Sequence, residues 1–255
     1  MGWLNKKIIS TVKKLHTIDK IYIICHKEKE QERYARWLSW TDKRTDVEFF
    51  SYKWADELCP AEISSWYVRN PEVEARESQY RTFPLNNAEI SCSINWIKLL
   101  EHAYHSGHER VLIFESDAYF DEYFEDDLNR AIKLINLVPK NQIDIVSIGA
   151  GGGQRYSVGD GCYVPGLFKV NSVRALEAVI FTRSGIQKTL AHIYKTRLTM
   201  VFDIELKYAV ESGIINMFWL EPSIVRQLSV DGLVDSYLNQ GQFRLLNFGP
   251  YQLRQ

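Results

Sequence analysis

Two carboxylates follow an apolar run near the middle of the chain. Residues 111–114 read Val-Leu-Ile-Phe, and Glu115 and Asp117 come next, separated by one residue. Side chains two positions apart in an extended segment share a face. Two hard oxygen donors on one face, at the carboxyl end of a buried parallel strand, suit a divalent cation that also holds a diphosphate. The spacing therefore predicts a metal site at Glu115 and Asp117, against the alternative of two solvated carboxylates at a strand end.

Other ionisable residues are weaker candidates for metal binding. His102, His105 and His108 recur every three residues where a helix is expected to end, a position that favours imidazolium without any metal. The acidic run 121–127 lacks the glycine and the closing glutamate of a calcium loop, so it is predicted to begin a helix in solvent. The four cysteines form no Cys-x-x-Cys pair and are expected to be reduced thiols.

Composition limits the classes of protein that remain. Of the 255 residues, 45% are apolar and 25% charged, which is typical of a globular domain and excludes disorder and coiled coils. The 31 basic and 32 acidic residues leave a net charge of −1, without the basic surplus that a nucleic-acid partner requires. The chain has neither an apolar run of membrane-spanning length nor a secretory signal, so we expect a cytoplasmic protein.

The N-terminal segment has its own pattern. Residues 1–16 place apolar side chains at helical spacing and lysines mostly on another face, which predicts a basic amphipathic helix. Such a helix either makes peripheral contact with an anionic membrane surface or packs on its own domain. We therefore divide the chain into an extension over 1–18 and one domain over 19–255.

Apolar runs alternate with helical patterns through the rest of the chain, which predicts an α/β domain with a mostly parallel sheet flanked by helices. Asn86 and Glu89 have the spacing of a capping box, and Ser184 and Asp203 are candidate N-caps. Strands are expected over 21–24, 47–52, 111–114, 143–148, 178–182 and 217–220, and helices around 34–38, 87–106, 125–138, 184–194 and 203–213.

Two long segments are expected to lie outside these elements. Residues 56–84 combine prolines with many charges and predict a surface excursion. Residues 149–170 are rich in glycine, but no helical pattern follows the glycines as a dinucleotide-binding fingerprint requires. We predict a mobile loop over 149–170, near a site whose specificity it would influence.

The order of these motifs resembles glycosyltransferase family 25, which includes lipopolysaccharide galactosyltransferases and collagen hydroxylysine galactosyltransferases. The similarity covers roughly residues 20 to 230. The matches are a helix start at Glu89, Ile90 and Cys92, a metal motif at Glu115, Asp117, Ala118 and Phe120, a strand and helix start over 178–185, Asp203, and residues 225–227.

The resemblance implies a single-domain GT-A fold of Rossmann-like type. It implies an inverting enzyme that moves a hexose, galactose or glucose, from a UDP-sugar to a hydroxyl of a glycan, a lipid-linked glycan or a hydroxylated protein. Asp117 would bind Mn²⁺ or Mg²⁺, and Glu115 would reach the metal or the ribose. Inversion requires a carboxylate base beside the acceptor hydroxyl. Asp203 is the candidate base, against its interpretation as a plain N-cap, and Glu205 is the second choice.

The positions that match the donor site also carry the main departures from the family. Ser116 replaces an aspartate between the two carboxylates, and Cys25-His26 replaces Asn-Leu. Asn95 and Trp96 replace Ser and His, and Ser91 replaces Gly. The predicted donor-binding residues are Cys25, His26, Glu89, Asn95, Glu115, Ser116 and Arg226.

Three alternatives remain open at this point. Arg226 pairs either with the diphosphate, with an acidic acceptor or with a surface carboxylate, and Gln227 lies next to it in the chain. The altered positions leave a catalytically inactive nucleotide-sugar-binding module as an alternative to an enzyme. A metal-dependent phosphoryl or nucleotidyl transferase would use the same two carboxylates.

Overall fold

The computed structural model describes residues 17–42, 44–78, 83–151, 155–156, 161–172, 175–229 and 231–233. In these residues seven α-helices flank an eight-stranded sheet, and a two-stranded ribbon lies beside it. The α/β class predicted from the sequence is confirmed. The predicted amphipathic helix over 1–16 lies outside the described residues.

The predicted strands and helices occur in the predicted order, together with elements that the apolar pattern did not predict. The strands are β1 (Lys20–Ile24), β2 (Val47–Phe50), β3 (Arg110–Glu115), β4 (Ala118–Tyr119), β5 (Ile145–Ser147), β6 (Cys162–Val164), β7 (Leu167–Val170), β8 (Ala178–Thr182), β9 (Met217–Leu220) and β10 (Arg226–Gln227). The helices are α1 (Gln31–Thr41), α2 (Pro60–Trp66), α3 (Pro71–Glu77), α4 (Asn87–His105), α5 (Phe124–Ile135), α6 (Arg183–Thr196) and α7 (Phe202–Glu211), with 3-10 turns η2 (Ala55–Glu57) and η3 (Lys140–Gln142).

The large sheet is mixed rather than mostly parallel. Its order is β2-β1-β3-β8-β5-β9-β7-β6, and β8 runs antiparallel to both of its neighbours, β3 and β5. The pair β7-β9 and the pair β6-β7 are also antiparallel. The apolar run of β8 is buried on both faces, and such a run has the same composition in either direction. The sequence pattern therefore located this strand but carried no signal for its direction.

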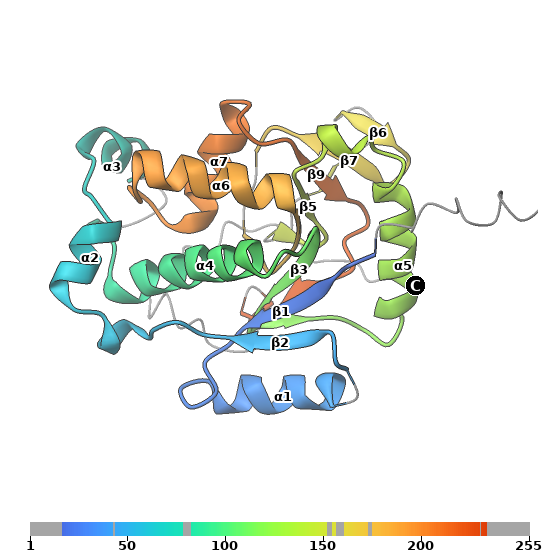
Figure 1. Ribbon diagram of the computed structural model, residues 1–255, viewed down its shortest axis with the longest axis horizontal. Helices are drawn as coiled ribbons and strands as arrows, with labels where there is room; N and C mark the ends of the chain where they lie inside the picture. Colours follow the sequence, from blue (N-terminus) through green and yellow to red (C-terminus); the bar gives the residue numbers. More distant parts are fainter. Residues whose placement is uncertain are drawn as a thin grey trace, which may run out of the picture.

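Helices cover both faces of the sheet (Figure 1). Val111 and Ile113 of β3 belong to the core beneath α4, α6 and α7, whereas Leu112 and Phe114 belong to the opposite core, beneath α1 and α5. All four side chains are fully buried. The period-two alternation along this strand thus supplies both cores at once.

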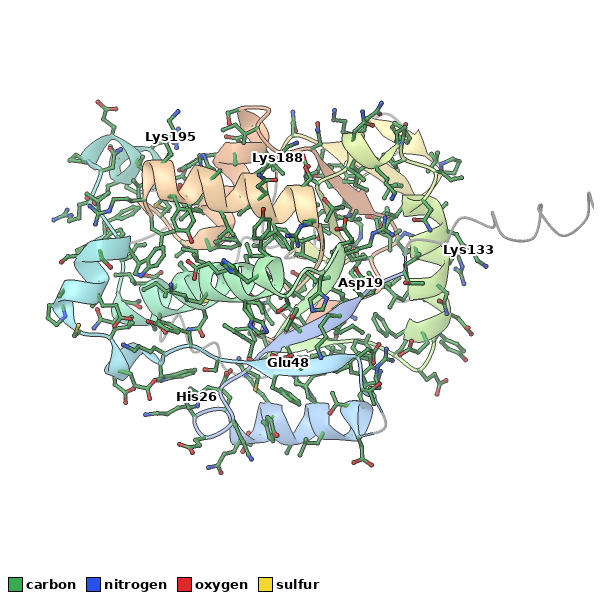
Figure 2. All side chains as sticks on the ribbon, viewed as in Figure 1. Asp19, His26, Glu48, Lys133, Lys188 and Lys195 are labelled. Carbon is green, nitrogen blue, oxygen red and sulfur yellow. The ribbon has the colours of Figure 1, made fainter. Side chains whose placement is uncertain are left out.

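The chain reverses its direction of travel across the sheet at β1. The connection from β1 to β2 runs through α1 on one face, and α4 leads into β3 on the other face. Both β2 and β3 pair with β1 in parallel register. In open α/β sheets, ligands bind outside the carboxyl ends of the strands at such a reversal. Figure 2 labels the two ends of β1, with Asp19 before the strand and His26 at its carboxyl end.

The predicted helix boundaries are partly confirmed. The side chains and backbones of Asn86 and Glu89 cap α4 reciprocally, with two N–H to oxygen distances of 2.9 Å. Thr182, rather than Ser184, is the N-cap of α6 and accepts a bond from the Gly185 amide. Val201 occupies the N-cap position of α7, so the N-cap interpretation of Asp203 is wrong.

The segments predicted to be irregular contain regular elements. The excursion over 56–84 includes α2 and α3, and the predicted loop over 149–170 includes β6 and β7. The strand predicted over 47–52 ends at Phe50. Residues 152–154 and 157–160 of the predicted loop lie outside the described part. In the part that is described, no helix combines the length and apolarity needed to cross a lipid bilayer.

Candidate active site

A pocket lies at the carboxyl ends of β1, β2 and β3, where the chain reverses across the sheet. The first half of α4 forms one wall, and Gln227 of β10 closes another side. Six residues singled out from the sequence line this pocket: Cys25, His26, Asn95, Glu115, Ser116 and Asp117. Residues from three separate segments, spread over about ninety positions, therefore meet where the topology places a ligand site.

The two carboxylates lie on the same side of the strand end, as their spacing predicts. The Gln227 amide nitrogen lies 3.4 Å from Glu115 Oε2 and 3.3 Å from Asp117 Oδ2. Trp96 Nε1 donates to Glu115 Oε1 at 3.2 Å, and the Ser229 hydroxyl donates to Asp117 Oδ2 at 2.5 Å. Burial and the neighbouring Asp117 charge raise the pKa of Glu115 to about 8. In the absence of a cation Glu115 therefore keeps its proton at neutral pH, and a bound cation would favour the charged form of both carboxylates.

This donor set fits a hard divalent cation. Glu115 and Asp117 supply carboxylate oxygens, and the buried Oε1 of Gln227 has no hydrogen-bond partner. Among the described residues there is no group of three or more His, Cys, Asp and Glu side chains that could hold a metal ion. Mg²⁺ is commonly held by one or two carboxylates together with substrate phosphates, so a pair is sufficient. The observed pair suits Mn²⁺ or Mg²⁺ bound together with a diphosphate.

Helix α1 fixes the backbone between the two carboxylates. The carbonyl oxygen of Ser116 accepts bonds from Arg36 at 2.6 Å and from Trp37 Nε1 at 2.9 Å. The Ser116 hydroxyl donates to Glu30 at 2.5 Å and accepts from Arg33 at 2.9 Å. The side chain of Ser116 is thus engaged by a buried ion pair, and the carboxylate that the family carries at this position is absent.

The altered positions on α4 shape the pocket wall. Asn95 accepts a bond from the Tyr52 amide at 2.6 Å and donates to the Lys53 carbonyl at 2.8 Å. The Ser91 hydroxyl donates to the same carbonyl at 2.8 Å. These bonds hold the segment after β2, which carries Trp54 into the pocket lining. Asn95 and Ser91 therefore act on the pocket by positioning this segment.

Cys25 and His26 form the part of the wall that follows β1. The imidazole of His26 makes an edge contact with the Trp54 ring, at 5.7 Å between centroids, and its backbone amide donates to Glu30 at 2.7 Å. Burial raises the pKa of the Cys25 thiol to about 12, so this side chain is a neutral, apolar surface at physiological pH. The aromatic and apolar wall suits a flat ligand group.

Two predicted donor-binding residues lie elsewhere. Glu89 uses its carboxylate to cap α4 and is absent from the pocket lining. Arg226 pairs with Asp231 at 2.8 Å, and neighbouring residues on a strand point to opposite sides. Gln227, the next residue, is therefore the one that faces the two carboxylates. The surface ion-pair interpretation of Arg226 is the one that the structure supports.

Asp203 lies in the first turn of α7, close to the pocket. The ring of the preceding Phe202 stacks on Trp96, with centroids 5.3 Å apart and planes 5° apart, and Trp96 in turn donates to Glu115. The charge of Asp203 contributes to the raised pKa of Glu115. Asp203 Oδ1 accepts from the Ile204 amide at 3.0 Å. The Asp203 carboxylate thus lies near Glu115 and Asp117 but is not among the residues that line the pocket.

Glu205, the second choice of base, has a structural role. Its Oε1 accepts bonds from the Thr199 amide at 2.6 Å, the Thr199 hydroxyl at 2.7 Å and the Met200 amide at 2.8 Å. We expect Glu205→Ala to lower the free energy of unfolding by about 3 kcal/mol, because buried donors lose a charged acceptor. Urea titration followed by circular dichroism measures this loss. A change below about 0.5 kcal/mol, the range of ordinary surface substitutions, would contradict it.

Glu177 is a buried carboxyl that the sequence analysis missed. It immediately precedes β8, it is fully buried, and its Oε1 accepts from the Gly151 amide at 2.6 Å while Oε2 has no partner. Its backbone carbonyl accepts from the Glu115 amide. Burial raises the pKa of Glu177 from 4.5 to about 7. A lone acidic residue before an apolar strand gives no sequence signal of such burial.

The raised pKa of Glu177 predicts a pH-dependent stability in metal-free buffer. The folded state binds the proton of Glu177 more tightly than the unfolded state does. The resulting contribution to the free energy of unfolding is complete below pH 4.5 and is lost as the pH rises through 7. Gln does not titrate, so only the wild type loses this contribution. We expect the free energy of unfolding of Glu177→Gln, relative to that of the wild type, to rise by roughly 3 kcal/mol from pH 5 to pH 8. Thermal melting in EDTA across this range tests it. Any packing cost of the substitution is the same at every pH and cancels when the two pH values are compared. A difference in stability between variant and wild type that does not change with pH would refute the prediction.

Comparison with known proteins adds no assignment. No protein-family model matches the chain, and no curated protein matches it.

Proposed function

We propose that this protein is an inverting, metal-dependent glycosyltransferase of the GT-A type. Its donor is a UDP-hexose, and its acceptor is a hydroxyl of a glycan, a lipid-linked glycan or a hydroxylated protein. The single observation that carries the proposal is the meeting of Glu115 and Asp117 in a pocket where the chain reverses across the sheet. The resemblance of the motif order to glycosyltransferase family 25 supports the same conclusion.

The proposed roles follow from the positions of the side chains. Mn²⁺ or Mg²⁺, held by Glu115 and Asp117, would supply positive charge against the departing diphosphate. The wall of Cys25, His26 and Trp54 gives a planar base an apolar surface. Asp203 accepts the proton of the acceptor hydroxyl as it attacks the sugar carbon from the side opposite the leaving group.

The altered positions support an active enzyme over an inactive binding module. Asn95 and Ser91 bind the backbone after β2, and Trp96 donates to Glu115 while it packs against the start of α7. These three substitutions on α4 thus have positioning roles in the pocket. The second alternative, phosphoryl or nucleotidyl transfer, differs in its products.

A panel of UDP-hexoses tests the proposal, with the whole chain incubated in Mn²⁺ or in EDTA. In Mn²⁺ we expect either slow hydrolysis, which releases UDP and free sugar, or transfer, which releases UDP and glycosylates the acceptor. Both should stop in EDTA. UDP binding without turnover for every donor and acceptor would favour the inactive module. Released UMP or hexose 1-phosphate, the products of cleavage between the two phosphates, would favour the other transferase class. Either result would overturn glycosyl transfer.

A further inference from the structure

The amide of Gln227 occupies the space between the two carboxylates. Its nitrogen lies 3.3 to 3.4 Å from three oxygens, Glu115 Oε2 and both oxygens of Asp117. Its own oxygen, Oε1, is buried without a hydrogen-bond partner. An amide has a donor end and an acceptor end of nearly equal shape. In the metal-free arrangement only the donor end is used.

This arrangement leaves an acceptor unsatisfied in a buried place, which costs free energy. A half-turn about the last side-chain bond would exchange the two ends of the amide. Without a cation the exchanged orientation is unfavourable, because the amide oxygen, instead of the N–H donor, would face both oxygens of Asp117. With a cation between the groups the preference reverses, since hard divalent ions take amide oxygens as well as carboxylates.

We propose that Gln227 is a third metal ligand, which turns its amide so that Oε1 joins Glu115 and Asp117 when the cation binds. The inference rests on the proposed metal dependence of the enzyme and adds a residue outside the acidic motif. Ser229 supports it, because its hydroxyl bond to Asp117 Oδ2 holds that carboxylate toward β10. The register of β10 against β4, with Gln227 opposite Ala118, places the amide there.

Removing the Gln227 amide should change Mn²⁺ affinity in opposite directions, depending on whether the amide binds the cation or competes with it for the carboxylates. If the amide only donates to the carboxylates, it competes with the cation, and its removal tightens metal binding. If Oε1 is a ligand, its removal weakens metal binding. Gln227→Met removes the amide and nearly keeps the side-chain size, whereas Gln227→Glu keeps an oxygen donor.

The experiment titrates the whole protein with Mn²⁺, with and without UDP, and follows free Mn²⁺ by electron paramagnetic resonance. We expect Gln227→Met to raise the dissociation constant by about tenfold or more and Gln227→Glu to bind at least as tightly as the wild type. The control is Gln187→Glu, which adds the same charge on the exposed side of α6 and should bind like the wild type. Melting in EDTA verifies that each variant is folded, and Gln227→Leu, which also lacks the amide, replaces Gln227→Met if the latter is not.

The outcomes are distinct. Unchanged or tighter Mn²⁺ binding by Gln227→Met, with binding by the wild type, overturns the ligand role of Gln227 and leaves the proposed function standing. Failure of the wild type to bind Mn²⁺ under both conditions overturns the metal dependence and this inference together. Weaker binding by Gln227→Met, with binding kept by Gln227→Glu, supports the ligand role.

Discussion

The substitution Asp117→Asn is expected to abolish Mn²⁺ binding and to lower donor turnover by about a thousandfold. The charge that the metal supplies to the leaving diphosphate contributes several kcal/mol, and each 1.36 kcal/mol corresponds to a factor of ten. Asn retains the size and one oxygen of the side chain but removes its charge. UDP release in saturating Mn²⁺ measures turnover, and Mn²⁺ titration measures binding.

The control for this variant is Asp126→Asn, an identical substitution at an exposed position in the first turn of α5. It should keep both Mn²⁺ binding and turnover. If Asp117→Asn turned over the donor as fast as Asp126→Asn, the carboxylate pair would not be the metal site and the proposed mechanism would be wrong.

The second large effect concerns Asp203. Asp203→Asn is expected to lower kcat by a factor of about 10² to 10⁴, the usual contribution of a general base. The KM for the donor and the affinity for Mn²⁺ should stay near their wild-type values, because Asp203 is not among the residues that line the pocket. Steady-state kinetics of sugar transfer, with donor and acceptor varied separately, give this distinction.

The control for Asp203→Asn lies on the same helix. Glu211→Gln removes a carboxylate charge at the exposed end of α7 and should leave kcat unchanged. A wild-type kcat in Asp203→Asn would remove this residue from the reaction. A joint loss of Mn²⁺ affinity and kcat would instead assign Asp203 to the metal site through its charge near Glu115.

Strong local patterns were predicted well. Strand β8 and strand β9 have the bounds that their apolar runs predict, and the capping box at Asn86 and Glu89 begins α4 as its spacing indicates. Strands β6 and β7 were missed because glycines and polar residues hide their short apolar stretches. The pairing of β7 with β9 depends on a partner some fifty residues away, and propensity does not register such a contact.

Within the site, Arg226 and Gln227 show the same contrast between what local sequence predicts and what strand pairing decides. The residues are adjacent, and their side chains point to opposite sides of β10, so a shift of one residue would exchange them. The chemistry of arginine favoured it as a phosphate ligand, but the pairing of Gln227 with Ala118 directs the amide to the carboxylates. Residue type alone therefore favoured the neighbour that pairs with Asp231, and not the one that faces the two carboxylates.

The sequence by itself determined that Glu115 and Asp117 follow a buried strand on one side, because both the spacing and the alternation of side chains are local properties. Only the tertiary structure decided what surrounds them. Trp96, Gln227 and Ser229 reach the two carboxylates from segments separated by 19 to 112 positions in the chain. Such contacts depend on sheet order, strand register and helix packing, which arise from the whole core rather than from any short run of residues.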